Sequence, residues 1–286
     1  MRLCQGQGDE HMRIYKFSLP FAAGILLTIS SISSGTGAQA YTIDVSGTGI
    51  ALGIAAKLGS QIHADSPADK VIVLPSMGSG GGLKALRDGV IGASFSARNL
   101  KESEKAHGLH EAHCMRTPLV FATTHPAPGN FNRNELPEIY GNALPKWNDG
   151  TQLKIILRSR SGSEIPYLAS QVPGLGEQFE AAFKRPDVAI GTSDQINAGL
   201  VGKISGSLAI MTLLQIKAED LDLNLVSIDG VMPSAATVSD QSYPFSLRVC
   251  LILPKDPTRL ALKLAQEMIS PEGRKMIISM GAAPSD

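Results

Sequence analysis

Three short segments of this sequence combine glycine with hydroxyl side chains in a way that suits anion binding. They are residues 46–49 (Ser-Gly-Thr-Gly), 78–82 (Gly-Ser-Gly-Gly-Gly) and 161–163 (Ser-Gly-Ser). Each precedes a segment with helical spacing, and a helix N-terminus offers free N–H donors and the positive end of the helix dipole. Arg158 lies just before the third segment, where a guanidinium can hold an oxyanion through two hydrogen bonds. A tight turn with an ordinary serine N-cap explains any one segment, but three in one chain favour an anion site.

A second group of chemically active side chains is His107, His110, His113 and Cys114. Spacings of three align imidazoles along one face of a helix, and His and Cys are common zinc or copper ligands. Gly108 interrupts such a helix, so a polar surface turn that leads into a strand is the simpler interpretation. We therefore expect no metal site here.

Motifs for nucleotide chemistry or hydrolysis are incomplete. The glycines at 47, 49 and 53 loosely imitate a dinucleotide loop, but no acidic residue follows the next strand. Lys84 is followed by Ala85, where a phosphate-binding P-loop needs Ser or Thr. No Gly-x-Ser-x-Gly elbow occurs. We expect neither an enzyme nor a cofactor, and we assign no catalytic residue.

The elements that position these loops alternate between strand and helix. Strands are predicted at residues 41–45, 71–74, 90–94, 117–124, 153–157, 207–211, 223–228 and 247–253. Helices are predicted at residues 50–62, 83–88, 135–140, 194–201, 257–269 and 271–280, with one more after residue 163. Strand, glycine loop, helix and strand again is the pattern of a parallel α/β sheet.

The N-terminal segment resembles a secretory leader. Arg13 and Lys16 precede a mostly apolar stretch over residues 17–32, and Ala38-Gln39-Ala40 forms a small-x-small cleavage site. We predict that residues 1–40 are upstream residues and a signal peptide cleaved after Ala40; a single membrane anchor is the alternative. Export leaves Cys114 and Cys250 in an oxidising compartment, either as a disulfide or as two buried thiols.

Composition excludes some functions. The 286 residues include 26 basic and 26 acidic side chains, so the chain has no net charge. Hydrophobic residues make up 43% of the chain, which is enough to form a core. Neutrality argues against a nucleic-acid partner bound through a broad basic face. Ten of the 29 glycines lie between Gly47 and Gly92, mostly where strands pass into helices. Selectivity for an anion must therefore come from local groups.

The order of these motifs resembles the phosphate-binding protein of the high-affinity phosphate ABC transporter, in the type 2 periplasmic binding protein superfamily. The matching strings are 78–84 with 92–94, 138–141 (Glu-Ile-Tyr-Gly), 146–150 (Lys-Trp-Asn-Asp-Gly), Arg158 with 161–163, 228–230 with Pro233-Ser234, Tyr243-Pro244, and 270–273 with Gly281 and Pro284. Together they span essentially the whole chain after residue 40.

The resemblance implies a two-lobed α/β clamshell with two crossover hinge strands, residues 117–125 and 243–253. Lobe I would comprise residues 41–124 plus 246–286, and lobe II residues 125–245. The ligand would lie in the cleft between the lobes, and lobe closure would signal occupancy to the transporter.

The resemblance also implies which residues bind the ligand. Ser79 matches a phosphate-contacting serine, and Arg158, Ser161, Gly162 and Ser163 match the contacts from the second lobe. At the first loop the Thr-Phe pair of the family falls on Ala51 and Leu52, so Thr48 is the substitute hydroxyl in our assignment.

One departure concerns selectivity. The family has an aspartate after its third strand, which accepts the proton of hydrogen phosphate, and the corresponding position here is Ala97, followed by Arg98. A carboxylate there excludes fully ionised anions. Arg98, if it faces the cleft, favours a more highly charged anion; a surface position is the alternative.

These observations predict an exported, monomeric binding protein that delivers a small oxyanion to an ABC permease in the inner membrane. Inorganic phosphate is the leading ligand. Sulfate, molybdate or an organic phosphate is the alternative, as is a sensor that uses the same fold without a transporter.

Overall fold

One strand, β4, runs through both halves of the central sheet and organises the whole structure. The computed structural model describes residues 40–285, which belong to one compact unit. The predicted signal peptide, apart from its last residue, lies outside the described residues. Between residues 40 and 285, no helix is both long enough and apolar enough to cross a lipid bilayer.

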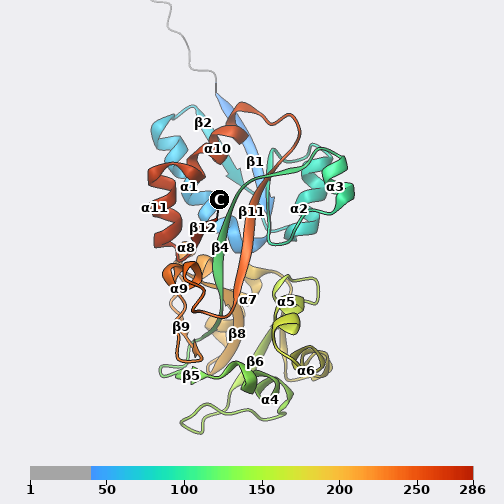
Figure 1. Cartoon of the computed structure of the whole chain (residues 1–286), viewed down its shortest axis with the longest axis vertical. Helices are drawn as coiled ribbons and strands as arrows, with labels where there is room; N and C mark the ends of the chain where they lie inside the picture. Colours follow the sequence, from blue (N-terminus) through green and yellow to red (C-terminus); the bar gives the residue numbers. More distant parts are fainter. Residues whose placement is uncertain (1–39, 286) are drawn as a thin grey trace, which may run out of the picture. The chain divides into compact units, whose positions relative to one another are not determined.

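The strands form one large mixed sheet and one small parallel pair. The order in the large sheet is β2-β1-β3-β11-β4-β8-β6-β7, with β9 and β12 also paired to β4, while β5 pairs with β10 (Figure 1). The strands are β1 (Tyr41–Gly47), β2 (Asp69–Val73), β3 (Ala93–Ser96), β4 (His110–Thr123), β5 (Asn130–Phe131), β6 (Lys154–Arg158), β7 (Ala189–Gly191), β8 (Ser207–Thr212), β9 (Asn224–Leu225), β10 (Ser227–Ile228), β11 (Ser246–Leu253) and β12 (Ala283–Ser285).

The helices cover the sheet and connect its parallel strands. They are η1 (Gly49–Ala51), α1 (Leu52–Asp65), α2 (Gly78–Arg87), α3 (Glu102–Ala106), η2 (Arg133–Glu135), α4 (Leu136–Gly141), α5 (Glu164–Gln171), α6 (Leu175–Ala182), α7 (Asp194–Lys203), α8 (Leu213–Ala218), α9 (Ala235–Ser239), α10 (Arg259–Ile269) and α11 (Pro271–Ser279). β1 is parallel to β2 and β3, and β6 is parallel to β7 and β8, so each half contains the strand-helix-strand unit that the sequence predicts.

β4 changes partner along its length. Its residues 110–118 pair antiparallel with β11, and its residues 119–122 pair antiparallel with β8. β11 in turn pairs with β3, so β4 and β11 together join the β1–β3 half to the β6–β8 half.

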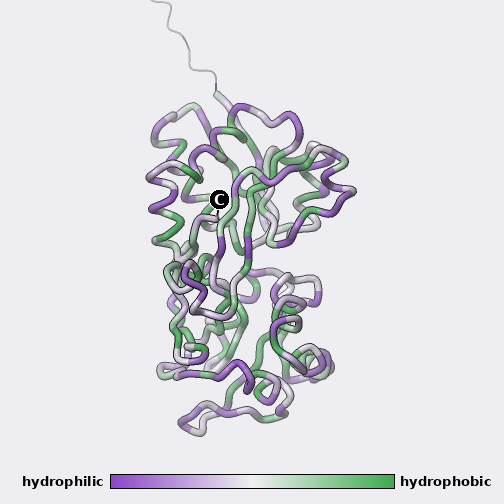
Figure 2. Tube along the Cα trace, in the orientation of Figure 1, coloured by the Kyte–Doolittle hydropathy of each residue, from purple (hydrophilic) through white to green (hydrophobic). Residues whose placement is uncertain are grey.

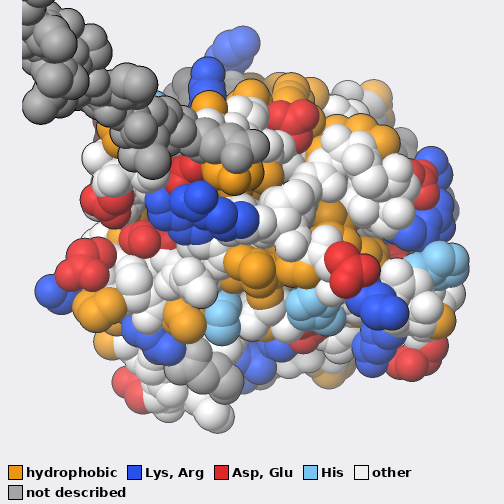
Figure 3. All heavy atoms as spheres, turned by 90° about the horizontal axis from the view of Figure 1, so that it is seen from above, with side chains coloured by type: hydrophobic (Ala, Val, Ile, Leu, Met, Phe, Trp, Pro, Cys, Tyr) orange, Lys and Arg blue, Asp and Glu red, His pale blue; other side chains and the backbone are white. Residues whose placement is uncertain are grey.

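The core lies between the sheet and its helices. The hydropathy-coloured trace shows hydrophobic residues concentrated along the central strands and hydrophilic residues in the outer turns (Figure 2). α10 illustrates the cause, because its apolar residues 260, 261, 264, 265 and 268 recur on one helical face and are all buried. Thr258 caps this helix by accepting a hydrogen bond from Ala261 N at 3.2 Å. On the face shown in Figure 3, positive and negative side chains are interspersed, in keeping with the neutral composition.

Most of the predicted elements are present; the third strand is shifted to Ala93–Ser96 from the predicted residues 90–94, and three further elements differ. α2 begins at Gly78, not near residue 83, so the glycine string forms the first turns of the helix. A Cβ at Gly82 would lie 2.6 Å from Gly47 Cα, so only glycine lets this helix approach β1 so closely. The strand predicted over residues 223–228 is two short strands, β9 and β10, with different partners.

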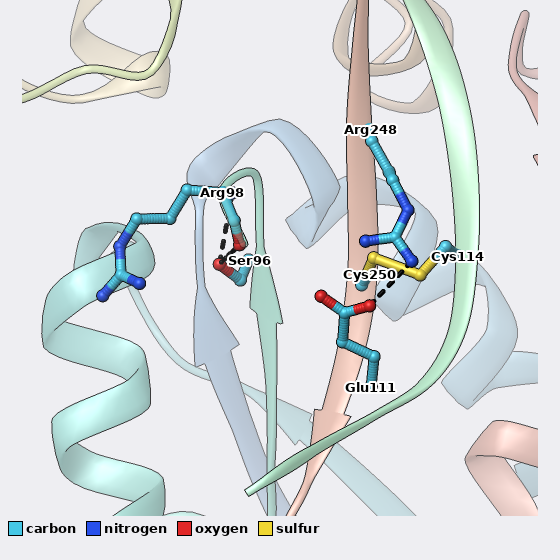
Figure 4. Close-up of a disulfide and its surroundings, with 6 residues drawn as sticks. All are labelled: Ser96, Arg98, Glu111, Cys114, Arg248 and Cys250. Atoms are coloured by element: carbon cyan, nitrogen blue, oxygen red, sulfur yellow. Dashed lines mark hydrogen bonds and ion pairs between the residues drawn. A yellow bond between two sulfur atoms is a disulfide. The ribbon is translucent and has the colours of Figure 1, made fainter. Parts of the chain in front are cut away.

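The third difference is the start of β4 at His110, which makes the predicted polar turn wrong for residues 110–114. Pairing with β11 accounts for this, because it places Cys114 directly opposite Cys250. The two cysteines form a disulfide with a Cα–Cα distance of 4.0 Å (Figure 4), so the disulfide is correct and the pair of free thiols is not.

Candidate functional site

A cavity of about 400 Å³ lies where the two halves of the sheet meet. The first half contributes Thr48 and residues 76–81 with Arg98, and the second half contributes residues around Arg158 and the start of α7. The lining residues are Thr48, Ser76, Met77, Gly78, Ser79, Gly80, Gly81, Arg98, Arg158, Ser159, Ser161, Gly162, Ser163, Glu164, Thr192, Ser193 and Asp194.

All the residues that the sequence assigned to the ligand lie on this one cavity. Thr48 and Ser79 come from one half, and Arg158 with residues 161–163 comes from the other. The structure thus brings together segments that are far apart in the sequence. Their contact with a ligand stays a prediction.

Three helices begin at the cavity wall. The first residues of α2 line it, as do the residues at the starts of α5 and α7, namely Ser163 with Glu164 and Ser193 with Asp194. Each start presents backbone N–H groups and a partial positive charge to the same space. This arrangement favours an anion without any excess of basic residues.

Ser79 is held in an orientation that suits a donor. Its Oγ accepts a hydrogen bond from the backbone N–H of Ala97 at 3.0 Å, which leaves the hydroxyl hydrogen available to an anion. Thr48 precedes η1, yet its hydroxyl does not cap that turn. Its backbone N–H is instead bonded to Phe95 O at 2.9 Å, which fixes the residue at the cavity wall.

Arg158 ends β6 and is only 6% exposed. Its Nη1 donates to Gly191 O at 2.6 Å, and Gly191 is also its strand partner on β7. Its Nε lies 3.2 Å from Asp194 Oδ1 and 3.7 Å from Glu164 Oε1. The guanidinium is therefore fixed in a desolvated position between two carboxylates.

Those two carboxyl groups are the principal site residues that sequence reasoning missed. Glu164 and Asp194 are both almost fully buried, and among the described residues no group hydrogen-bonds to Glu164 Oε2. Burial and the carboxylate of Asp194 raise the pKa of Glu164 to about 7, while Arg158 acts in the opposite direction. Glu164 thus gains or loses its proton close to neutral pH.

The local charge balance follows from these three side chains. With both carboxylates ionised, Arg158 is outnumbered and the group carries one net negative charge; with Glu164 protonated, the group is neutral. A bound oxyanion is then compatible with one proton lying between Glu164 and the ligand. The site can therefore bind an anion together with a proton.

The two halves also touch beside the cavity. Gln195 of α7 donates from Nε2 to Gly49 O at 3.0 Å, and a side chain at position 49 would collide with Asp194. Glycine at 49 therefore permits this close approach of η1 to α7.

Arg98 lines the cavity, but its charge is compensated. Nη1 and Nη2 bond the two oxygens of Glu104 at 2.9 and 2.7 Å, and these bonds lower the pKa of Glu104 to about 2. The cavity-facing position is thus correct for Arg98, which is half-buried, but its charge is paired with that of Glu104, whose side chain is only 18% exposed.

The histidine cluster does not form a metal site with Cys114. Within residues 40–285, the residues close enough to share an ion are Glu111, Cys114 and Cys250, and both sulfur atoms are in the disulfide. His107 follows α3, whereas His110 and His113 lie on β4.

The sequence contains only weak signals for Glu164 and Asp194 as site residues. β7 has three residues, too few for a periodic hydrophobic pattern. The sequence therefore does not predict a strand before Ser193 and Asp194, and it does not place the start of α7 beside the anion loops. Glu164 directly follows the predicted anion loop. An ionised acidic side chain repels an anion, so the sequence does not indicate it as a ligand-binding residue unless its pKa is raised.

Comparison with solved structures identifies the fold as that of two-lobed binding proteins. A Clostridium perfringens protein described as a phosphate ABC transporter substrate-binding protein, solved with bound phosphate, has a TM-score of 0.70 and 16% identity, covering 86% of this chain and 100% of that chain. An ABC-type phosphate transport receptor from Vibrio cholerae has a TM-score of 0.55 and 18% identity (84% and 99% covered). A periplasmic molybdate-binding protein from Azotobacter vinelandii has a TM-score of 0.57 and 15% identity (85% and 100% covered).

The predicted two-lobed α/β fold is thus confirmed. The family model of the PBP superfamily domain matches residues 33–272, so the chain belongs to the PBP superfamily. No curated protein matches the chain.

Proposed function

We propose that this protein is an exported solute-binding protein that captures a small oxyanion, with phosphate as the leading ligand, for an ABC importer. It binds and releases its ligand without chemical conversion. The single observation that supports this most strongly is the convergence of three helix starts and the buried Arg158 on one cavity. Similar folds in phosphate- and molybdate-binding proteins support the same class of ligand.

Phosphate is favoured over sulfate by the carboxyl of Glu164. Hydrogen phosphate can share its proton with this carboxyl, whereas fully ionised sulfate meets a carboxylate with no hydrogen to offer. The acidic residue absent at position 97 is in this view replaced by one from the other half of the molecule.

Lobe movement completes the mechanism. We take lobe I as residues 41–124 plus 246–286 and lobe II as residues 125–245, with β4 and β11 as the hinge strands between them. Ser79 and Thr48 would approach the ligand from lobe I, and Arg158 with Ser161, Gly162 and Ser163 from lobe II. A ligand bound by both lobes stabilises the closed state, which the permease then recognises.

Location and partners follow from the same proposal. Cleavage after Ala40 would release the chain into the periplasm as a monomer. Its partners are the anion and an ABC permease of the inner membrane, and nucleic acid is not among them.

Calorimetry of the purified chain that begins at Tyr41 tests the proposal. Phosphate, sulfate and molybdate are titrated at pH 6 and pH 8, with thermal melts at the same concentrations. We expect saturable binding of phosphate with a rise in Tm, and weaker binding of sulfate at pH 8. Absence of both heat and Tm change with all three anions would refute oxyanion binding.

A further inference from the structure

A second cavity, of about 640 Å³, adjoins the first and shares Arg98 and residues 161–163 with it. Arginines are prominent in its lining: Arg98, Arg116, Arg160 and Arg248. Ala97 also lines the second cavity, and it has no polar side-chain group that could repel an anion there. An oxyanion bound beside Arg158 would thus have open, basic space next to it.

Two of these arginines form a like-charged pair across the strands. Arg116 of β4 lies directly opposite Arg248 of β11, two residues along each strand from the Cys114–Cys250 pair. Alternation along a strand places the arginine pair and the disulfide on the same face of the sheet. Like charges directly opposite each other destabilise a sheet, so this pair needs an explanation.

Arg248 is neutralised, and Arg116 is not. Arg248 extends past the disulfide to Glu111, where its Nη2 lies 2.7 Å from Oε2 (Figure 4). Arg116 contacts Ser246 Oγ at 3.5 Å, and within residues 40–285 it has no carboxylate partner. Arg98 and Arg160 are paired with Glu104 and Glu180.

The arginine pair also lies close to the point where β4 changes its pairing partner. Position 118 is the last residue of β4 paired with β11, and from Leu119 the strand pairs with β8. Arg116 is therefore next to the point where β4 leaves one half of the sheet for the other. From there a cation can contribute to a ligand that spans the two halves.

We propose that the second cavity binds a second anionic group of the ligand, through Arg116 and the free donors of Arg248. The natural ligand is then a small compound with two anionic groups, one of them phosphoryl. The first cavity holds the phosphoryl group, and the second cavity holds the other anionic group. This inference rests on the proposed oxyanion function and extends it from inorganic phosphate to diphosphates or phosphorylated carboxylic acids.

The test compares the affinities of four probes for the chain that begins at Tyr41. Orthophosphate has one group, pyrophosphate has two phosphoryl groups, phosphoglycolate pairs phosphoryl with carboxylate, and glycerol 3-phosphate has an uncharged distal end. We expect one or both two-headed probes to bind at least about tenfold more tightly than orthophosphate and glycerol 3-phosphate. Which of the two binds more tightly identifies the second group.

Arg116→Gln should abolish that advantage while leaving orthophosphate affinity within about twofold. It should also raise Tm, because it removes the repulsion from Arg248. Arg116→Lys keeps the charge and should keep part of the advantage. Arg87→Gln, a substitution in an exposed ion pair on α2, is the matched control and should change nothing.

The outcomes separate the two proposals. Equal affinity for orthophosphate and both two-headed probes in the unaltered chain would overturn the second-group inference and leave the oxyanion function intact. So would an Arg116→Gln effect of the same size on every probe. If none of the four probes binds, both proposals fall.

Discussion

Arg158 Nε lies 3.2 Å from Asp194 Oδ1, and both side chains are buried. The guanidinium is thus removed from water before any ligand arrives; its Nη1 is held by Gly191 O, while its Nε contacts Asp194 as an ion pair without a hydrogen bond. A binding group already desolvated and fixed needs little reorganisation, which improves affinity and specificity. The same contact means that an incoming anion competes with carboxylates for the arginine.

Removal of the arginine should abolish this site. We expect Arg158→Ala to weaken phosphate binding at least about 100-fold, because it removes a charged donor and leaves two buried carboxylates facing the ligand. Calorimetry measures the loss, and circular dichroism confirms that the variant is folded. Arg158→Lys should restore part of the affinity but not the two-donor geometry. Unchanged phosphate affinity in Arg158→Ala would show that the ligand lies elsewhere.

The proton shared with Glu164 should appear in the pH dependence of affinity. For sulfate, the affinity of the native chain relative to that of Glu164→Gln should fall about tenfold per pH unit above pH 7, since ionised Glu164 repels an anion that has no hydrogen; for phosphate this ratio should fall less, because hydrogen phosphate donates its own hydrogen to the carboxylate. The ratio at each pH cancels the titration of phosphate itself. Sulfate does not titrate in this range, and Glu164→Gln should bind it more tightly than the native chain at pH 8. A constant ratio for sulfate from pH 6 to 9 would contradict the role of Glu164.

The raised pKa of Glu164 also makes a prediction for stability. The folded state keeps this proton up to about pH 7, whereas the unfolded chain loses it near 4.5. The free energy of unfolding should therefore fall as pH rises from about 4.5 to 7 and then level off. Urea unfolding of native and Glu164→Gln chains at several pH values isolates this effect, with an upper limit of about 3 kcal/mol. A native-minus-variant difference that is independent of pH would mean that Glu164 is not proton-bound in the fold.

Ser79 provides a smaller test of the first half of the cavity. Ser79→Ala removes one hydroxyl donor and the acceptor for Ala97 N–H, so phosphate affinity should fall about fivefold to tenfold. Ser60→Ala, on the exposed face of α1, is the control and should leave affinity unchanged. Equal affinities for the two variants would place the ligand outside reach of α2.

The disulfide should contribute strongly to stability. It joins residues 136 positions apart, and closing so long a loop restricts the unfolded chain by up to about 5 kcal/mol. The Cys114→Ala/Cys250→Ala double variant should therefore unfold at a clearly lower Tm than the native chain. Reducing agent should lower the Tm of the native chain only. Identical melting curves for the two chains without reductant would contradict this assignment.

Local pattern is sufficient for the strand-loop-helix units, and it also singles out Arg158, which the structure places on the cavity wall while its contact with a ligand stays a prediction. β1 with α1, β6 with α5, and the capped helices α10 and α11 each have their signals within one short stretch of chain. The predicted anion loops rest on the same kind of local signal, since glycine, hydroxyl and helix start are neighbours in sequence.

The sequence does not show which distant segments of the chain become neighbours in space. Glu164 and Asp194 become one charged group only because β6 and β7 are adjacent strands whose following helices begin at the same edge. The arginine pair likewise depends on the register of β4 against β11, which no local property of either strand determines. The proposed selectivity for phosphate depends on such a relation, because Glu164 and Asp194 come from different strand-helix units.

The disulfide between β4 and β11 also closes part of the chain into a covalent ring. Every residue from 115 to 249, including β6, α5 and α7, lies on a closed ring of chain, while β1, α2 and α10 lie on the two arms outside it. A protease that cuts once within the ring opens it but separates nothing until the bridge is reduced. In an oxidising compartment, a molecule nicked in the half that contains Arg158 would therefore remain a single covalent molecule.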